Sequence, residues 1–85
     1  MELLNRIPFV CEDKPYEIRV LFSDNTINIV VFTNNYPATG FRHHIQIPKK
    51  SDPRNIIGST VFNETVELAK SDIVEKRWER LTAVS

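Results

Sequence analysis

Two adjacent histidines, His43 and His44, are the side chains of this protein best suited to acid–base or metal chemistry. They lie in the segment GFRHHIQIP, where apolar and polar residues alternate as in a β-strand. Successive side chains of a strand point to opposite faces, so the pair cannot close on one metal ion. The chain has one cysteine and no third histidine, which leaves no ligand set for structural zinc. We therefore expect neither a metal nor a cofactor.

A nucleophilic enzyme site is also poorly supported by the sequence. A serine or cysteine nucleophile needs a histidine base beside it, and Ser23 and Cys11 are available. Neither lies in a segment that resembles a nucleophile elbow, and two glycines are too few for a phosphate-binding loop. We expect His43 to lie at the core margin with local hydrogen-bond partners and His44 to be exposed on the other face. We predict that the protein is not an enzyme.

The elements that place these histidines follow from the hydrophobic pattern of the chain. Between residues 15 and 33, apolar and polar residues alternate on both sides of Asp24-Asn25, and both of these residues tolerate the positive φ of a two-residue turn. A hairpin closed by that turn pairs only apolar residues on one face, and a slip of one residue would break every pair. The expected pairs are Phe22 with Ile27, Val20 with Ile29, and Ile18 with Val31.

A long helix is expected after the strands. Apolar residues recur there at spacings of three and four, which forms one apolar stripe along a helix. The stripe consists of Phe62, Val66, Ala69 and Ile73. In the same segment, Asp72 and Lys76 have the i, i+4 spacing of a stabilising surface ion pair.

Together these patterns predict an α+β fold. The expected architecture is an antiparallel β-meander of three to four strands packed on one long C-terminal α-helix, a ββββα two-layer sandwich. The 85 residues suffice for one such domain. The expected elements are strands over residues 6–12, 15–23, 26–33 and 40–47, a short helical turn over 53–57 and a helix over 60–81.

Composition narrows the functional classes. Eleven basic and eleven acidic residues give a net charge of zero, which argues against a polybasic nucleic-acid-binding protein. No apolar run is long enough to span a membrane, and the start MELLNRIPFV lacks the basic region and the cleavage site of a signal peptide. The single cysteine, Cys11, suits a small buried side chain in a reducing compartment. We expect a cytoplasmic protein with no membrane partner.

The second face of the predicted sheet is less polar than an open sheet usually is. Large apolar residues share it with arginine and histidine, a mixture that suits a protein interface. Either residues 1–5 fold over this face, or it binds a protein partner or a second copy of the chain. Trp78, between Arg77 and Arg80 on the helix, is a further candidate contact. The candidate partner-binding residues are Leu21, Val30, Phe32, Arg42, His44 and Trp78.

A weaker alternative is the binding of single-stranded nucleic acid. Residues 41–58 contain four basic residues against one acidic residue, so this stretch is locally basic. Phe32 could stack on a base while nearby lysines meet phosphates, although one aromatic residue is few for such a sheet. The residues of this alternative site are Arg42, His44, Lys49, Lys50 and Arg54.

Overall fold

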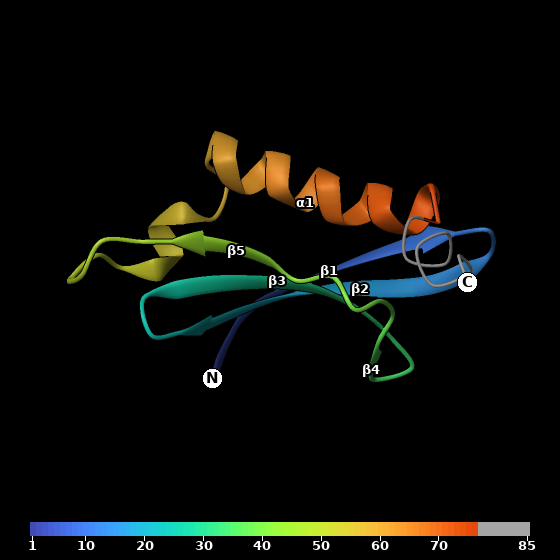
Figure 1. Ribbon diagram of the computed structural model, residues 1–85, viewed down its shortest axis with the longest axis horizontal. Helices are drawn as coiled ribbons and strands as arrows, with labels where there is room; N and C mark the ends of the chain where they lie inside the picture. The colour runs from blue at the N-terminus through green and yellow to red at the C-terminus, as the bar shows by residue number, and fades with distance from the viewer. Residues whose placement is uncertain (77–85) are drawn as a thin grey trace, which may run out of the picture.

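The chain forms two layers, an antiparallel sheet and a helix that lies across one face of the sheet (Figure 1). A computed structural model describes residues 1–76. The predicted α+β fold, a meander packed on one C-terminal helix, is confirmed. The elements are β1 (Glu2–Cys11), β2 (Lys14–Ser23), β3 (Thr26–Thr33), β4 (Tyr36–Pro37), β5 (His43–Gln46), the 3₁₀ helix η1 (Pro53–Ile56) and α1 (Thr60–Val74).

Three two-residue turns with positive φ at both positions connect the first four strands. They are Glu12-Asp13, Asp24-Asn25 and Asn34-Asn35. Turns of this type match the right-handed twist of the strands that they join, and Asn and Asp tolerate the conformation well. The turn at Asp24-Asn25 was predicted. The turn at Asn34-Asn35 was not predicted, because no strand was expected between the strands over 26–33 and 40–47. This turn places the short β4 against the end of β3.

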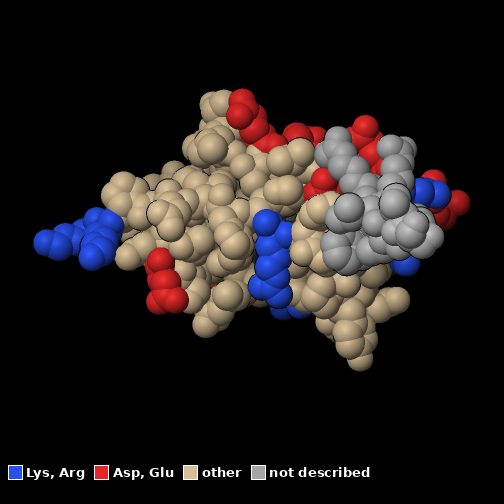
Figure 2. Space-filling model, viewed as in Figure 1, with Lys and Arg blue, Asp and Glu red and all other residues tan. Residues whose placement is uncertain are grey.

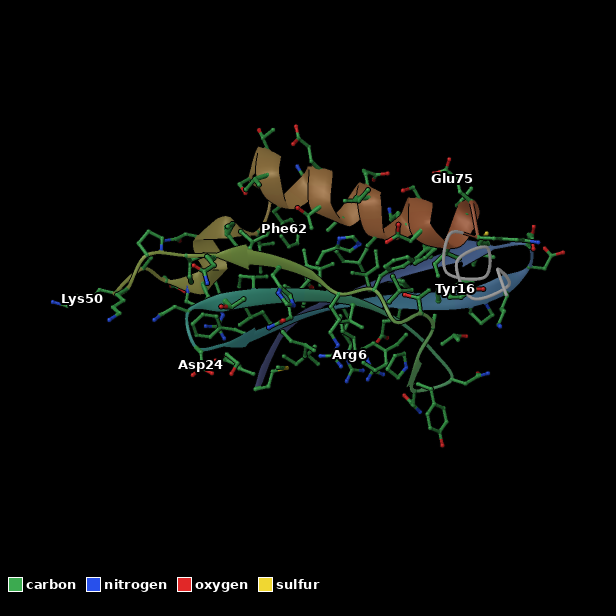
Figure 3. The ribbon with its side chains drawn as sticks, viewed as in Figure 1. Arg6, Tyr16, Asp24, Lys50, Phe62 and Glu75 are labelled. Carbon is green, nitrogen blue, oxygen red and sulfur yellow. The ribbon has the colours of Figure 1, made fainter. Side chains whose placement is uncertain are left out.

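The predicted register between β2 and β3 is observed in every pair. Ile18 pairs with Val31, Val20 with Ile29 and Phe22 with Ile27. These paired residues lie on the face of the sheet that α1 covers, and they pack against the apolar stripe of the helix to form the core. Figure 3 shows Phe62 pointing from α1 toward the sheet. The buried apolar core cluster consists of Ile18, Val20, Ile27, Ile29, Val31, Phe62, Val66 and Ala69.

Strand β1 is longer than the segment 6–12 that the sequence indicated. It pairs with β2 along its whole length, with an irregularity between Leu3 and Asn5. This bulge inserts Leu4 as an extra residue, and Leu4 packs against the core. Because Glu2–Asn5 belong to the strand, they do not fold over the outer face of the sheet. The first of the two explanations for the apolar residues on that face is therefore wrong.

The fourth position of the sheet is occupied by two short strands rather than by one strand over residues 40–47. β4 pairs with the last two residues of β3, and β5 pairs with the first four. Between them the chain leaves the sheet, so the predicted strand begins only at His43. His43 lies opposite Ile29, and His44 lies opposite Asn28.

Helix α1 begins at Thr60 and ends at Val74, and the side chain of the preceding Ser59 caps it by accepting a hydrogen bond from the Phe62 N–H. The helix was predicted to end at residue 81. Residues 75 and 76 are not helical, and residues 77–81 lie outside the described part of the chain. The expected pair between Asp72 and Lys76 does not form. Asp72 is buried, and the Lys76 ammonium instead lies 3.6 Å from a Glu12 carboxylate oxygen.

Candidate protein-binding surface

The outer face of the sheet, opposite α1, carries most of the predicted binding residues. In the observed register, Leu21 pairs with Asn28, Arg19 with Val30 and Glu17 with Phe32. Parity therefore places Leu21, Val30 and Phe32 on this face, as the sequence predicted. Arg6 projects from the same side of the sheet, away from the helix (Figure 3).

Exposure on this face differs from what parity alone suggests. Val30 is only 2% exposed, whereas Leu21 and Phe32 are half-buried. Leu21 lies between its strand partners Leu3 and Asn28. Val30 cannot contact a partner without a rearrangement of its neighbours. It therefore packs beneath the surface residues of this face and is not itself the contact residue that the sequence had suggested.

Arg19 is the residue that covers the centre of the face. Its guanidinium lies over the Phe32 ring, with 4.2 Å between the guanidinium carbon and the ring centroid. Its Nε donates to Glu17 Oε1 at 2.6 Å, and its Nη2 donates to Asn35 Oδ1 at 2.9 Å. These three contacts hold Arg19 and Phe32 in one arrangement, which we call the Arg19–Phe32 platform.

The platform borders a shallow hollow of about 290 Å³. Exposed prolines and the asparagines of the third turn form much of its rim. Rigid prolines and a held arginine lose little conformational freedom when a partner binds, which favours association. The hollow is lined by Pro8, Pro15, Tyr16, Glu17, Arg19, Phe32, Asn34 and Asn35.

The platform should contribute measurably to stability. Arg19→Ala removes the cation–π contact and two hydrogen bonds, so we expect the free energy of unfolding to fall by about 1 kcal/mol. Arg6→Ala is the matched control, because Arg6 is exposed on the same face and has one long contact, 3.8 Å to Glu17. Urea unfolding followed by circular dichroism would measure both. Equal values for the two variants would show that the platform is not held as described.

The remaining predicted contacts are dispersed. Arg42 and His44 are exposed, and His44 lies on the outer face opposite Asn28 near the sheet edge. Lys49 and Lys50 are exposed in the turn after β5. Trp78, with its neighbours Arg77 and Arg80, lies outside the described residues.

Arg54 is already engaged within the molecule. Its Nη2 donates to Glu2 Oε2 at 2.8 Å, which ties η1 to the start of β1. The basic stretch of residues 41–58 therefore does not form one continuous cationic surface. The basic residues of this stretch that have no ion-pair partner among residues 1–76 are Arg42, Lys49 and Lys50, which flank β5 on either side.

The two histidines have different environments, as predicted. His43 faces α1, where its Nε2 lies 2.7 Å from Asp72 Oδ2 and shares a hydrogen bond with it. The Asp72 side chain is 7% exposed and that of His43 is 21% exposed. The prediction of a core-margin histidine with a local partner is confirmed for His43, and His44 is exposed on the opposite face.

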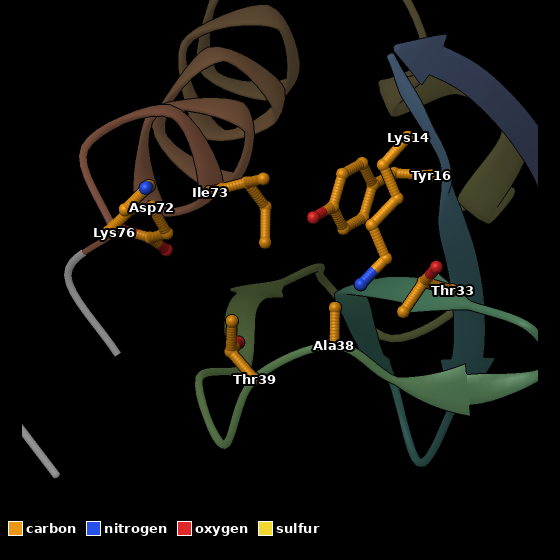
Figure 4. Close-up of a pocket in the computed structure, with 8 residues that line it drawn as sticks. All are labelled: Lys14, Tyr16, Thr33, Ala38, Thr39, Asp72, Ile73 and Lys76. Atoms are coloured by element: carbon orange, nitrogen blue, oxygen red, sulfur yellow. The ribbon is translucent and has the colours of Figure 1, made fainter. Parts of the chain in front are cut away.

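A small cavity of about 90 Å³ lies beside this pair, between the end of α1 and the sheet (Figure 4). Tyr16 and Ile73 approach each other across it, and the Lys14 ammonium lies 5.6 Å from the Tyr16 ring centroid. Its volume would admit only a few water molecules, which is far below an ordinary ligand site. Its lining residues are Lys14, Tyr16, Thr33, Ala38, Thr39, Asp72, Ile73 and Lys76.

The chemistry available to the His43–Asp72 pair is limited. An aspartate that orients a histidine is one part of a nucleophilic site, but the nucleophile must lie within hydrogen-bond reach of the imidazole. Within residues 1–76, the hydrogen bond of the His43 ring is to Asp72, and no serine or cysteine is bonded to it. Within the same range, no three His, Cys, Asp or Glu side chains are grouped to hold a metal ion.

Comparison of the chain with protein-family models, with curated proteins and with solved structures found no match. Within the described residues, no helix is both long enough and apolar enough to cross a membrane. The site must therefore be interpreted from its own residues.

Proposed function

We propose that this chain is a small non-enzymatic module that binds a protein partner through its outer sheet face. The observation that carries the proposal is the Arg19–Phe32 platform. Arginine and aromatic residues are favoured in the centres of protein interfaces, where most of the binding energy is concentrated. Here Glu17 and Asn35 hold the pair in place beside a hollow rimmed with prolines.

Charge on the outer face favours a different protein over a second copy as the partner. Arg6 and Arg19 lie opposite each other in neighbouring strands, and Glu17 is the acidic residue beside them. Two copies docked face to face would bring these arginines together, and like charges in contact oppose association. A partner that sets an acidic group against Arg6 and Arg19 and apolar groups around it would complement the face. We therefore expect the isolated chain to be a monomer in sedimentation velocity.

The proposal is tested by affinity capture with matched baits. The wild-type chain, Arg19→Glu and Glu64→Ser would be immobilised and exposed to an extract of the source cells. Glu64 is exposed on α1, on the layer opposite the outer face. We expect proteins that wild type and Glu64→Ser retain to be lost from Arg19→Glu. Retention of the same proteins by all three baits would sink the proposal.

The nucleic-acid alternative has less support. Arg19 occupies one face of Phe32, and Arg54 is paired with Glu2, so both the stacking residue and one of the cations are engaged. Arg42, Lys49 and Lys50 remain as exposed cations. Three phosphate contacts would give weak binding that added salt removes.

We further propose a cytoplasmic location for the protein. Support comes from the single cysteine, Cys11, which has no second cysteine with which to form an intramolecular disulfide.

A further inference from the structure

We propose that the free edge of β5 binds an acidic, extended segment of a partner protein as an additional strand of the sheet. This edge is a different surface from the Arg19–Phe32 platform, so the inference does not depend on the function proposed for the outer face. Strand addition takes its affinity from backbone hydrogen bonds and its specificity from side chains on either side.

Along this edge, the backbone of β5 presents N–H and C=O groups that have no partner within residues 1–76. The Ile47 N–H donates to the Asn25 carbonyl at 3.0 Å, so the backbone groups of Ile47 point toward β3. Along a strand, the N–H and C=O groups of successive residues point to opposite sides, so the residues one and three positions before Ile47 point theirs away from β3. These are His44 and Gln46, and both side chains are exposed. A segment laid beside β5 would find two donors and two acceptors.

The opposite edge of the sheet, β1, is only partly open to such pairing. The two-residue turn after β1 pairs Cys11 with Lys14, so the backbone groups of Arg6, Pro8 and Val10, at the other parity, face the free edge, and two of these three residues offer no N–H to a partner. Pro8 has no N–H to donate. The Arg6 N–H donates to Asn5 Oδ1 at 2.9 Å. Blocked donors of this kind protect an edge from unwanted strand pairing. In the part of the chain that the structure describes, the N–H groups of His44 and Gln46 have no such protection.

Helix α1 supplies exposed apolar side chains next to β5. Val61 and Leu68 are 49% and 46% exposed. Leu68 follows Val61 by seven residues, and Asp72 follows Leu68 by four. These spacings place all three side chains along one side of the helix. Asp72 contacts His43 of β5, which shows that this side faces the β5 edge. A strand added to β5 could therefore cover Val61 and Leu68 with its own apolar side chains.

Charge at the ends of β5 indicates the chemistry of the segment. Arg42 directly precedes β5, and Lys49 and Lys50 closely follow it. In Figure 2, which shows this side of the molecule, the surface over β5 and the adjoining side of α1 is largely uncharged, with basic side chains near its centre and at its far end. Two β5 strands paired with each other would bring like charges together, whereas an acidic segment would meet a cation at each end.

The test is a titration of the isotopically labelled chain with short synthetic peptides, followed by amide NMR. In the probe set, Glu or Asp alternates with Val, Ile or Thr. The controls replace each acidic residue with Lys, and a single-stranded DNA oligonucleotide of similar length serves as another anion. We expect the acidic peptides to shift the amides of His44 and Gln46 and to slow their hydrogen exchange. We expect the basic peptides to do neither.

A pair of variants separates strand addition from general attraction. Gln46→Pro removes one outward N–H and leaves the β3-facing groups in place, so we expect peptide affinity to fall about tenfold, which corresponds to about 1.4 kcal/mol. Gln46→Ala retains the N–H and should bind as wild type does. If Gln46→Pro does not fold, Lys49→Glu with Lys50→Glu alters only exposed side chains and should lower affinity about tenfold at low salt.

Several results would overturn the inference. These are no change at His44 and Gln46 with any acidic peptide, equal binding of acidic and basic peptides, or equal affinity of Gln46→Pro and Gln46→Ala. Binding of the oligonucleotide at Arg42, Lys49 and Lys50 without acidic-peptide binding would assign the edge to nucleic acid instead. Arg19→Glu should leave peptide binding unchanged, and loss of binding in that variant alone would place the peptide on the outer face.

Discussion

Phe62→Ala should lower the free energy of unfolding by about 3–5 kcal/mol, because the ring fills the space between α1 and the sheet. Phe62 is 3% exposed and belongs to the core cluster that joins the two layers. Folded domains are stable by only about 5–15 kcal/mol in total, so this single change would remove a large part of the margin. Urea unfolding monitored by circular dichroism measures the effect directly.

Val61→Ala is the matched control for this prediction. Val61 is the preceding residue on the same helix, but it is about half exposed. Truncation of an exposed side chain changes stability by about 0.5 kcal/mol or less. If the two variants lost similar amounts of stability, the helix would not be docked through Phe62 and the two-layer packing would be incorrect.

His43→Ala should lower the free energy of unfolding by about 1–3 kcal/mol, the contribution of a hydrogen bond to a charged group in a partly buried site. The variant deprives the buried Asp72 carboxylate of its bond to His43 Nε2. The neighbouring change, His44→Ala, should alter stability by about 0.5 kcal/mol or less, because His44 is exposed on the other face. Thermal and urea unfolding of both variants would give the comparison.

A conservative variant shows whether the hydrogen bond is responsible. His43→Gln keeps an N–H donor on a side chain of comparable reach and should recover part of the stability lost in His43→Ala. Equal losses for His43→Ala and His44→Ala would mean that the His43–Asp72 bond does not contribute, and the assignment of opposite faces would lose its main energetic support.

The hairpin of β2 and β3 could be predicted because two independent signals agreed. Residues Asp24-Asn25 tolerate a two-residue turn, and only that turn places the apolar residues of both strands on one face. The same turn chemistry is present at Asn34-Asn35. There the following strand is only two residues long and contains Pro37, so no alternation signalled it.

Burial on the outer face could not be predicted from strand parity. Parity places Val30 and Phe32 on that face, but the side chain that covers Phe32 belongs to Arg19 in the neighbouring strand. Its position depends on Asn35 in a turn 16 residues away. A long side chain can cover apolar surface with its stem and its charged head. Where such a side chain lies depends on the hydrogen-bond partners that the tertiary structure supplies.

The pairing of His43 with Asp72 was also missed, although one signal was present. Asp72 lies three residues after Ala69, so it shares a side of the helix with the apolar stripe rather than with the solvent-facing residues. The i, i+4 spacing to Lys76 suggested a surface pair instead. Which residue Asp72 meets depends on how α1 is positioned over β5, 29 residues away, and local sequence does not determine that position.

The measurement that tests the proposed function most directly is site-specific photo-crosslinking in the source cells. A photoreactive residue would replace Arg6, which is exposed on the outer sheet face, or Glu64, which is exposed on α1. We predict a discrete crosslinked protein for position 6 and none for position 64, with the position-6 product lost when Arg19→Glu is added. Crosslinks of equal yield at both positions, or a position-6 product that persists with Arg19→Glu, would contradict binding through the outer sheet face.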